Sequence, residues 1–349
     1  MTPFGTSDFH LNSPAALIAA LPAVLGFIPE KSLVLVTFED GELGCVMRVD
    51  LSAGLVGSLA HMADVAAGNG PDAAVAVIVD NDGASCLMCL EEHQFLAAVL
   101  EQQLDGRGVE LLAAYVVDRL VAGGRWHRAD GRPGEGTIED PMSSPLAAAA
   151  VLDGRPLYAK RAELQEVITP VDPVRAEALR GAMLRAEHDG ELRPDADARR
   201  DVEHALAMGR GLSEGLVPDD DDLARLGCGF TDPRVRDTLY ALAVGSEADR
   251  AEALWASLAR TLPDPWRTEA LVLLAFSAYA RGDGPLAGVS LEAALLGDQG
   301  HRMARMLDQA LQSGMRPEQI RELAQTGYRL AKRLGVRLPP RQGMGRRAG

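Results

Sequence analysis

The sequence predicts an α/β domain with a mixed, mostly parallel sheet flanked by helices, followed by an all-helical domain. Unbroken apolar runs rich in strand-forming residues occur at 33–38, 74–79 and 109–117, which is typical of strands covered on both faces. Helical patterns separate the later runs, and a strand–helix–strand succession favours parallel pairing. From Ser144 onward the strand signals stop, and beyond Pro170 and Pro173 helical patterns run to the end of the chain.

We therefore divide the chain into three parts. Residues 1–170 are expected to form the α/β sandwich domain, residues 171–335 the all-helical domain, and residues 336–349 a basic flexible tail. Arginines in the tail alternate with prolines and glycines, a composition typical of a disordered end or of a segment that docks to an acidic partner.

The first element is a helix beginning at Ser13 and Pro14, because a serine hydroxyl caps free amides and proline suits a first turn. Pro22 lies inside the apolar pattern, so the helix either kinks there or is shorter than the pattern suggests. Gly26 is expected to end it. Lys31 then lies in a loop before the first strand; it lacks the glycines of a phosphate-binding loop, which favours simple turn chemistry.

A hairpin follows the strand at 33–38. Asp40 and Gly41 form a strong turn signal, and residues 43–51 alternate as a half-buried strand, antiparallel to the first. Arg48 and Asp50 fall on the same face of this second strand. We expect them to pair, either as a structural ion pair or as part of a ligand site.

The remaining α/β elements alternate. A helix is expected at 55–66, the third strand at 74–79, a second amphipathic helix over 95–104 and the fourth strand at 109–117. This order predicts that the second, third and fourth strands run in the same direction and that their ends meet at one edge of the sheet.

Three aspartates stand at that predicted edge, each at the carboxyl end of a strand: Asp50, Asp80 and Asp118. Ligands of open α/β sheets bind along this edge, and converging carboxylates could hold Mg²⁺ or serve as acid and base. Alternatively, these aspartates only start turns and cap helices. Both explanations stay open, and we assign no catalytic residue, cofactor or metal ligand.

The same edge receives the segment containing Gly124, Arg125 and Trp126. Arginines around a tryptophan could recognise an anion with a planar group. A tryptophan packed on the sheet edge is the alternative explanation. His127 could act as a general base, but the chain contains no G-x-S-x-G nucleophile motif.

Cys86 and Cys89, with His93 four residues further on, have the one metal-like spacing in the chain. Zinc normally takes four ligands, and no second cysteine pair exists. A thioredoxin-like dithiol, which leads into a helix from a strand, remains open. The apolar neighbours of the two cysteines favour a third alternative, in which both thiols are buried.

The second half reads as helical throughout. Helices are expected at 173–188, 197–212, 220–227, 232–244, 247–262, 265–280, 285–296, 301–312 and 317–334. Tyr279, Gly282 and Ala287 resemble a tetratricopeptide pattern, although stacked arrays need about three repeats. The acidic run that begins at Asp219 is expected to be a solvated helix cap.

Five stretches of the sequence carry a resemblance to one protein family: NSPAALIAALPAVLGFIPEKSLVLVTF, MRVDL, GRW, SPLAAAAVLDGRPLYAKRAEL and LLAFSAYARGDGPLAGVSLEAAL. Together they resemble the domain-of-unknown-function 4192 family of actinobacteria, over most of the chain except the tail. The resemblance implies no activity, because the family has no established one to carry over.

Composition limits the function classes. The formal net charge of −15 argues against a general nucleic-acid or membrane binder, and four cysteines are too few for a disulfide framework, which favours the cytoplasm. We expect an uncharacterised, non-catalytic adaptor that binds a protein partner through its helical domain. The alternative is a sensor of a small anionic ligand, or an Mg-dependent enzyme, with its site at the sheet edge.

Overall fold

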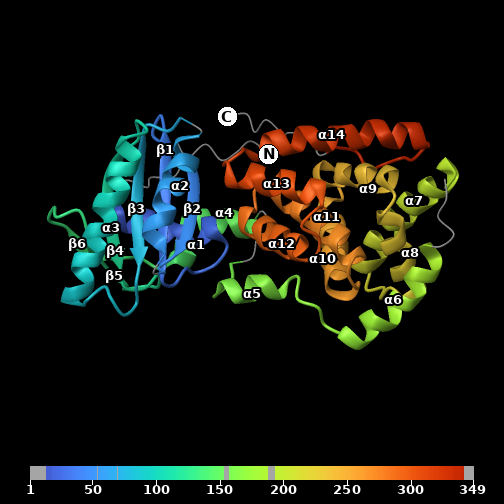
Figure 1. The fold of residues 1–349 in the computed structure, drawn as a ribbon, viewed down its shortest axis with the longest axis horizontal. Coiled ribbons are helices and arrows are strands. Elements are labelled where there is room, and N and C mark those ends of the chain that lie inside the picture. The colour runs from blue at the N-terminus through green and yellow to red at the C-terminus, as the bar shows by residue number, and fades with distance from the viewer. Residues whose placement is uncertain (1–12, 53, 69, 153–156, 188–192, 342–349) are drawn as a thin grey trace. The chain divides into compact units, whose positions relative to one another are not determined.

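A computed structural model describes residues 13–52, 54–68, 70–152, 157–187 and 193–341 (Figure 1). The chain forms two compact units. Unit 1 takes in the chain up to Glu163 and the short segment Gln312–Gly314, and unit 2 takes the rest of the described chain. The division falls between Glu163 and Leu164, ahead of the boundary expected at 170.

Unit 1 is built on a six-stranded sheet with the order β2-β1-β3-β4-β5-β6. The strands are β1 (Ser32–Glu39), β2 (Glu42–Asp50), β3 (Ala73–Val79), β4 (Glu110–Val117), β5 (Arg125–Arg128) and β6 (Glu135–Thr137). Only β3 and β4 pair in parallel, and every other neighbouring pair is antiparallel.

The expectation of a mostly parallel sheet is therefore wrong. The expected hairpin is present, but its first strand does not lie at the edge: β1 pairs with β2 on one side and with β3 on the other, antiparallel to both. Two further antiparallel strands, β5 and β6, form in the segment that was expected to be a loop. Placing β1 in the interior replaces the expected β2–β3 parallel pair with two antiparallel ones.

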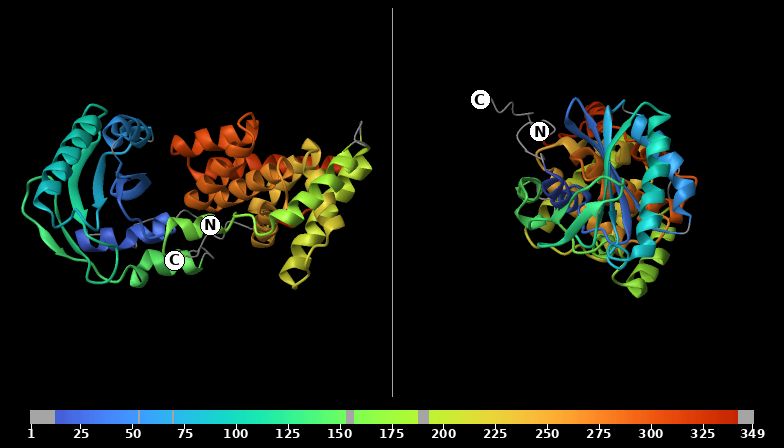
Figure 2. Two further views of the ribbon diagram at one scale, coloured as in Figure 1. Left: turned by 60° about the horizontal axis from the view of Figure 1, so that its bottom comes forward. Right: turned by 90° about the vertical axis from the view of Figure 1, so that its left-hand side faces the viewer.

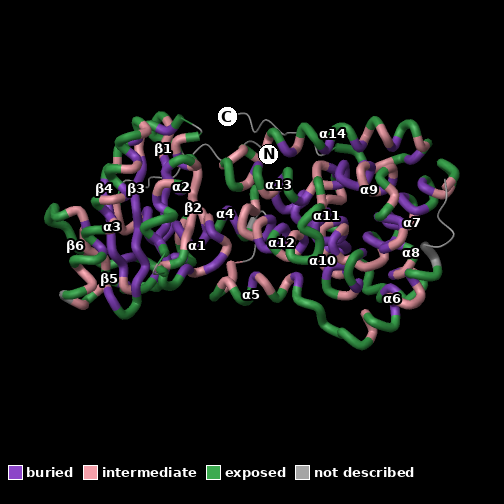
Figure 3. The backbone as a smooth tube through the Cα atoms, viewed as in Figure 1, coloured by how far each residue is buried: buried purple, intermediate pink, exposed green. Residues whose placement is uncertain are grey.

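Helices cover the sheet. They are α1 (Pro14–Leu25), α2 (Leu55–Ala67), α3 (Leu87–Asp105), the 3₁₀ helix η2 (Pro141–Ser143), α4 (Pro145–Leu152) and α5 (Arg161–Glu166), which spans the division between the units. In Figure 2 (right), α2 and α3 lie on one side of the sheet. Their apolar residues, such as Leu59 and Leu100, form one core with Leu33, Leu35 and Ile78 of the sheet (Figure 3). Consecutive residues of β1 and β3, which point to opposite faces, are buried, and this explains why the two strands are apolar without alternation.

The first helix begins and ends as its sequence predicts. The Ala16 amide donates to Ser13 Oγ at 3.2 Å, and Gly26 at the carboxyl end adopts the left-handed conformation with φ 72°. The helix continues through Pro22, which is buried. Of the two alternatives, a kink or a shorter helix, the shorter helix is excluded, because α1 runs past Pro22 to Leu25.

Unit 2 is helical. It contains α6 (Pro173–Glu187), α7 (Asp195–Ser213), α8 (Asp220–Phe230), α9 (Pro233–Leu239), η3 (Tyr240–Val244), α10 (Ala248–Thr261), α11 (Trp266–Arg281), α12 (Gly284–Gly297), α13 (Arg302–Gln312) and α14 (Pro317–Leu334). Asp219 caps α8 by accepting from the Asp222 amide at 2.8 Å, as expected for the acidic run. Trp255 packs edge to face on Phe230, with 5.5 Å between ring centroids, and anchors the core.

A tetratricopeptide-like array is not supported. The hairpin of α11 and α12 is present, with Gly282 in the left-handed conformation and Asp283 capping α12. However, the helices of unit 2 range from 7 residues in α9 to 19 in α7, and η3 interrupts their succession. An array needs equal helix pairs that stack on one another, so the match around Gly282 reflects one tight helical turn.

The chain after α14 folds back on unit 2 as far as it is described. Val336 is buried, the Ser246 amide donates to the Pro340 carbonyl at 2.8 Å, and the Arg341 guanidinium lies 4.8 Å from the Tyr328 ring centroid. Residues 342–349 of the expected tail lie outside the described residues. Among those described, no helix combines the length and the apolar character needed to cross a membrane.

Candidate functional site

The three aspartates lie at one border of the sheet. β2, β3 and β4 run in the same direction, because β1 is antiparallel to both β2 and β3. Ser32 at the start of β1 stands opposite both Asp50 and Val79, and Val79 stands opposite Val117. Asp50, Asp80 and Asp118 therefore end three strands on the same side, although β1 separates the first from the second.

The three carboxylates do not share a ligand site, because each has a different partner. Asp50 pairs with Arg48, and Asp118 Oδ1 accepts from the Arg125 amide at 2.8 Å. Asp80 binds Lys31 and His93. Within the described parts of the chain, no group of three His, Cys, Asp or Glu side chains is placed to hold a metal ion.

Arg48 is held in place by the protein itself. Its Nε donates to Ser32 Oγ at 2.8 Å, and its guanidinium lies 5.8 Å from the Phe27 ring centroid. The Ser32 hydroxyl in turn donates to the Glu30 carbonyl at 2.7 Å. Because these contacts occupy the guanidinium and leave its side chain 15% exposed, the Arg48–Asp50 pair has the geometry of a structural ion pair.

Arg125 and Trp126 do not act together. Both begin β5, and neighbouring residues of a strand point to opposite faces. Trp126 packs edge to face on Tyr115, with 5.3 Å between ring centroids, and the absence of a side chain at Gly136 leaves room for its indole. Arg125 is exposed. A planar anion therefore cannot lie between this cation and this ring.

Asp80 contacts several side chains at this border of the sheet. Its Oδ1 lies 2.5 Å from Lys31 Nζ and accepts from the Gly83 amide at 3.0 Å, and its Oδ2 lies 3.1 Å from His93 Nε2. Lys31 also pairs with Asp82 at 2.8 Å. Burial alone would raise the pKa of the Asp80 carboxyl, but hydrogen bonds from Lys31, the Gly83 amide and His93 hold it below its ordinary value.

His93 is buried, with 3% of the residue exposed. Its second ring nitrogen, Nδ1, is also buried and has no hydrogen-bond partner among the residues described. Buried polar atoms in native proteins nearly always have a partner, so an unpaired ring nitrogen suggests a further role.

The two cysteines precede His93, with Cys89 one turn before it. Cys86 is the residue that precedes α3, and Cys89 lies in the first turn; both are free and half-buried. The Cys89 amide, the Cys89 thiol and the Met88 amide lower the pKa of Cys86, although no side chain makes a regular capping hydrogen bond at this helix start. The hydrogen bond to Cys86 and burial raise the pKa of Cys89.

The sequence singled out this cysteine pair but not its surroundings. The spacing of Cys86, Cys89 and His93 was visible, and the dithiol alternative matches their place at the start of a helix that follows a strand. The pairing of His93 with Asp80, and of Asp80 with Lys31, was missed. Lys31 and Asp80 are 49 residues apart, and no local pattern joins them.

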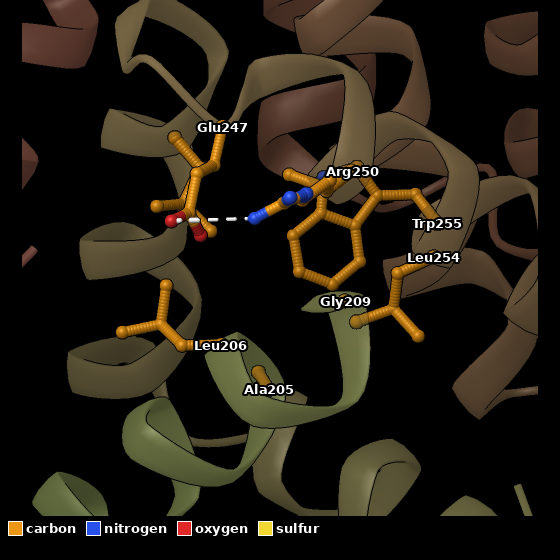
Figure 4. A pocket seen from close by; sticks show the side chains of 9 residues that line it. Ala205, Leu206, Gly209, Glu247, Arg250, Leu254 and Trp255 are labelled. Carbon is orange, nitrogen blue, oxygen red and sulfur yellow. Dashed lines mark ion pairs between the residues drawn. The ribbon is translucent and has the colours of Figure 1, made fainter. Parts of the chain in front are cut away.

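Unit 2 contains a shallow hollow of about 240 Å³ (Figure 4). Glu247 at its rim pairs with Arg210 at 2.9 Å and with Arg250 at 3.6 Å. The lining is Ala205, Leu206, Gly209, Leu242, Glu247, Arg250, Ala251, Leu254 and Trp255. Its two charged side chains, Glu247 and Arg250, are therefore paired with each other.

Unit 2 also exposes a group of apolar side chains next to α6, which we call the valine surface: Val171, Val174, Leu216 and Val217. Val174 is 81% and Val217 79% exposed. Arg175 ties the two segments together, because its Nε donates to Asp220 Oδ1 at 2.8 Å and its Nη2 to the Pro218 carbonyl at 3.3 Å.

Comparison with known proteins gives a family but no activity. A family model described as "Domain of unknown function (DUF4192)" matches residues 14–318, most of the 349-residue chain. No curated protein matches the chain, and no solved structure matches it.

Proposed function

The protein belongs to the DUF4192 family, and we propose that within this fold Cys86 and Cys89 perform thiol–disulfide exchange. The observation that carries the proposal is the contact between two free, half-buried thiols at the start of α3. The pKa of Cys86 is lowered by amides of α3 and by the Cys89 thiol, whereas the pKa of Cys89 is raised. A thiol of low pKa attacks and a neighbouring thiol resolves, which is the division of labour of a redox dithiol.

The substrate class is a disulfide, written RS–SR. The Cys86 thiolate attacks one sulfur, the RS–SR bond breaks, and one RS⁻ leaves and takes up a proton, which gives a mixed disulfide on Cys86. The Cys89 thiol then loses its proton and attacks Cys86 Sγ, and the second RS⁻ leaves. Both cysteines are oxidised to one disulfide, and RS–SR is reduced to two RSH.

The test uses the reduced full chain and oxidised glutathione. We expect the wild type to lose about 2 Da, two hydrogen atoms, as the internal disulfide forms. Cys89→Ser should accumulate a glutathione adduct on Cys86, and Cys86→Ser should form an adduct on Cys89 about tenfold more slowly. Equal adduct rates in the two variants, or no internal disulfide in the wild type, would overturn the proposal.

Cys45 supplies the matched control within the same unit. It is also a free cysteine, but burial raises its pKa to about 11. Cys45→Ser should therefore leave both the rate and the product of glutathione treatment unchanged.

The valine surface supports a second candidate function, the binding of a protein partner by unit 2. Val174 and Val217 are large apolar side chains that are mostly exposed, and Arg175 joins the two segments that carry them. Exposed apolar patches often mark the binding site of a partner protein. Leu296, which is 79% exposed on α12, provides a matched control elsewhere on unit 2.

In quantitative pull-downs from the native cell, a partner retained by the wild type and by Leu296→Asp should be lost from the double variant Val174→Asp, Val217→Asp. A partner retained equally by all three proteins would exclude the valine surface as the binding site.

A further inference from the structure

The second step of the proposed exchange needs a proton acceptor. Cys89 is protonated at neutral pH, since its hydrogen bond to Cys86 and its burial raise its pKa. A thiol attacks a disulfide only as the thiolate. The proton of Cys89 therefore has to be removed after the mixed disulfide forms on Cys86.

His93 has a ring nitrogen whose lone pair can accept this proton. An ionised carboxylate only accepts hydrogen bonds, so the contact of 3.1 Å between Asp80 Oδ2 and His93 Nε2 requires the proton of the neutral ring to be on Nε2. Nδ1 is then the unprotonated nitrogen. It is the atom that is buried without a partner.

Helix α3 places the side chain of His93 next to that of Cys89, the resolving cysteine. Cys89 and His93 are four residues apart in α3, so their side chains lie on the same face one turn apart. In the reduced protein the Cys89 thiol is engaged with Cys86. Once Cys86 carries RS, its sulfur is no longer a thiolate acceptor, and the Cys89 thiol is released to turn toward a new one.

We propose that His93 Nδ1 accepts the proton of Cys89 in the resolving step, that Asp80 fixes the ring in the required tautomer, and that Lys31 holds Asp80 in place. This assignment rests on the proposed thiol–disulfide exchange. The proton moves from Cys89 Sγ to His93 Nδ1, the resulting imidazolium is paired with the Asp80 carboxylate, and the Cys89 thiolate displaces RS⁻ from Cys86.

Other charged groups face the same place. Asp82 shares Lys31 with Asp80, Glu92 of α3 acts on both thiols, and His127 of β5 interacts electrostatically with His93. Burial is the largest cause that lowers the pKa of His127, and the charge of His93 lowers it further. His127 thus stays neutral at neutral pH, and it does not oppose the formation of an imidazolium at His93.

The experiment separates the two steps with dithiobis(nitrobenzoic acid), an aromatic disulfide that releases one coloured thiolate per step. Under single-turnover conditions the first release reports attack by Cys86 and the second reports resolution by Cys89. For His93→Ala we expect the second release to slow about 10- to 100-fold while the first changes less than about twofold. Added imidazole should restore the second release.

The pH dependence of the second release distinguishes a proton acceptor from a residue whose role is only structural. In His93→Ala the second release should keep rising through the alkaline range in which a free thiol titrates, about pH 9, and in the wild type it should rise less steeply over that range. Asp80→Asn, which removes the negative charge that stabilises the imidazolium, should also slow the second release. His61→Gln, at an exposed histidine of α2, is the matched control and should change neither release.

The possible failures are distinguishable. No first release that depends on Cys86 would overturn the proposed exchange itself. A first release that Cys86→Ser abolishes, together with a second release unchanged in both His93→Ala and Asp80→Asn, would overturn only the role of His93. A second release that is slowed but not restored by imidazole, with an unchanged pH profile, would also count against it.

Discussion

A Cβ atom on Gly83 would lie 2.0 Å from Oδ2 of Asp80, closer than any two such atoms can approach. The Gly83 amide at the same time donates to Asp80 Oδ1 at 3.0 Å. The turn between β3 and α3 can therefore close around the buried carboxylate only if residue 83 has no side chain.

The first prediction concerns this turn. Gly83→Ala should lower the free energy of unfolding by about 1–3 kcal/mol, because the new methyl group displaces the carboxylate from its donors. It should also slow the second thiolate release. Denaturant unfolding measures the first effect. Gly57→Ala in α2 is the control: nothing lies within 4 Å of its Cβ position, so the alanine should be neutral or stabilise by up to about 1 kcal/mol.

The second prediction is a pH dependence of stability. The pKa of Asp80 is lower in the folded protein than its ordinary value of 3.8, so between the two values the unfolded chain binds more protons. The stability contributed by the Asp80 charge is therefore fully present above about pH 4 and is lost as the pH falls through the folded pKa. The difference in unfolding free energy between the wild type and Asp80→Asn should shrink on acidification. A difference that grows toward low pH would contradict the assignment.

The third prediction concerns thiol reactivity. At about pH 8, iodoacetamide should modify Cys86 first, then Cys89, and Cys45 last. The reasons are the lowered pKa of Cys86, the raised pKa of Cys89, and the burial that raises the pKa of Cys45 to about 11. Peptide mapping after short labelling times gives the order directly. Faster labelling of Cys89 than of Cys86 would reverse the roles assigned to them.

The fourth prediction concerns the packing of α14. A Cβ on Gly327 would lie 2.8 Å from both the Thr238 carbonyl and the Ala241 methyl group. Gly327→Ala should therefore destabilise unit 2 by about 1–3 kcal/mol, although glycine to alanine in a helix is otherwise favourable. Gly181→Ala in α6 is the matched control, because only the flexible Arg185 side chain lies near its Cβ position. Thermal unfolding of the two variants should shift in opposite directions.

The positions of most elements could be predicted from the sequence because their signals are local. The apolar run at 33–38 lies within β1, and the expected helix at 317–334 coincides with α14. The common direction of β2, β3 and β4 was predicted correctly, but the order of the strands in the sheet could not be predicted in the same way. Asp40 and Gly41 specify the turn between β1 and β2, but no residue of that turn specifies which of the two strands pairs with β3.

The short strands β5 and β6 gave no local signal. β5 has the sequence Arg125–Arg128 and contains two arginines, a tryptophan and a histidine, so no apolar alternation marks it. Its pairing depends on Trp126 packing against Tyr115, which lies on another strand. A charged four-residue segment of this kind reads as a loop until its partner is known.

For the candidate site, the sequence identified the side chains but not their grouping. Asp80 was predicted at the sheet border, and Cys86, Cys89 and His93 were noted for their spacing. Grouping Asp80 with Asp50 and Asp118 followed from the expected parallel sheet. The contacts instead join Asp80 to Lys31 and His93, through a turn whose shape depends on Gly83.

The interior place of β1 has a consequence for fragments of the chain. A fragment that lacks residues up to Glu39 would leave β3 as the outermost strand, with unpaired amides and carbonyls along a segment that is apolar on both faces. Such an edge is a template for joining other chains. Fragments that begin inside the hairpin should therefore aggregate, whereas a cut in the turn at Asp40 and Gly41 that leaves both halves together should not.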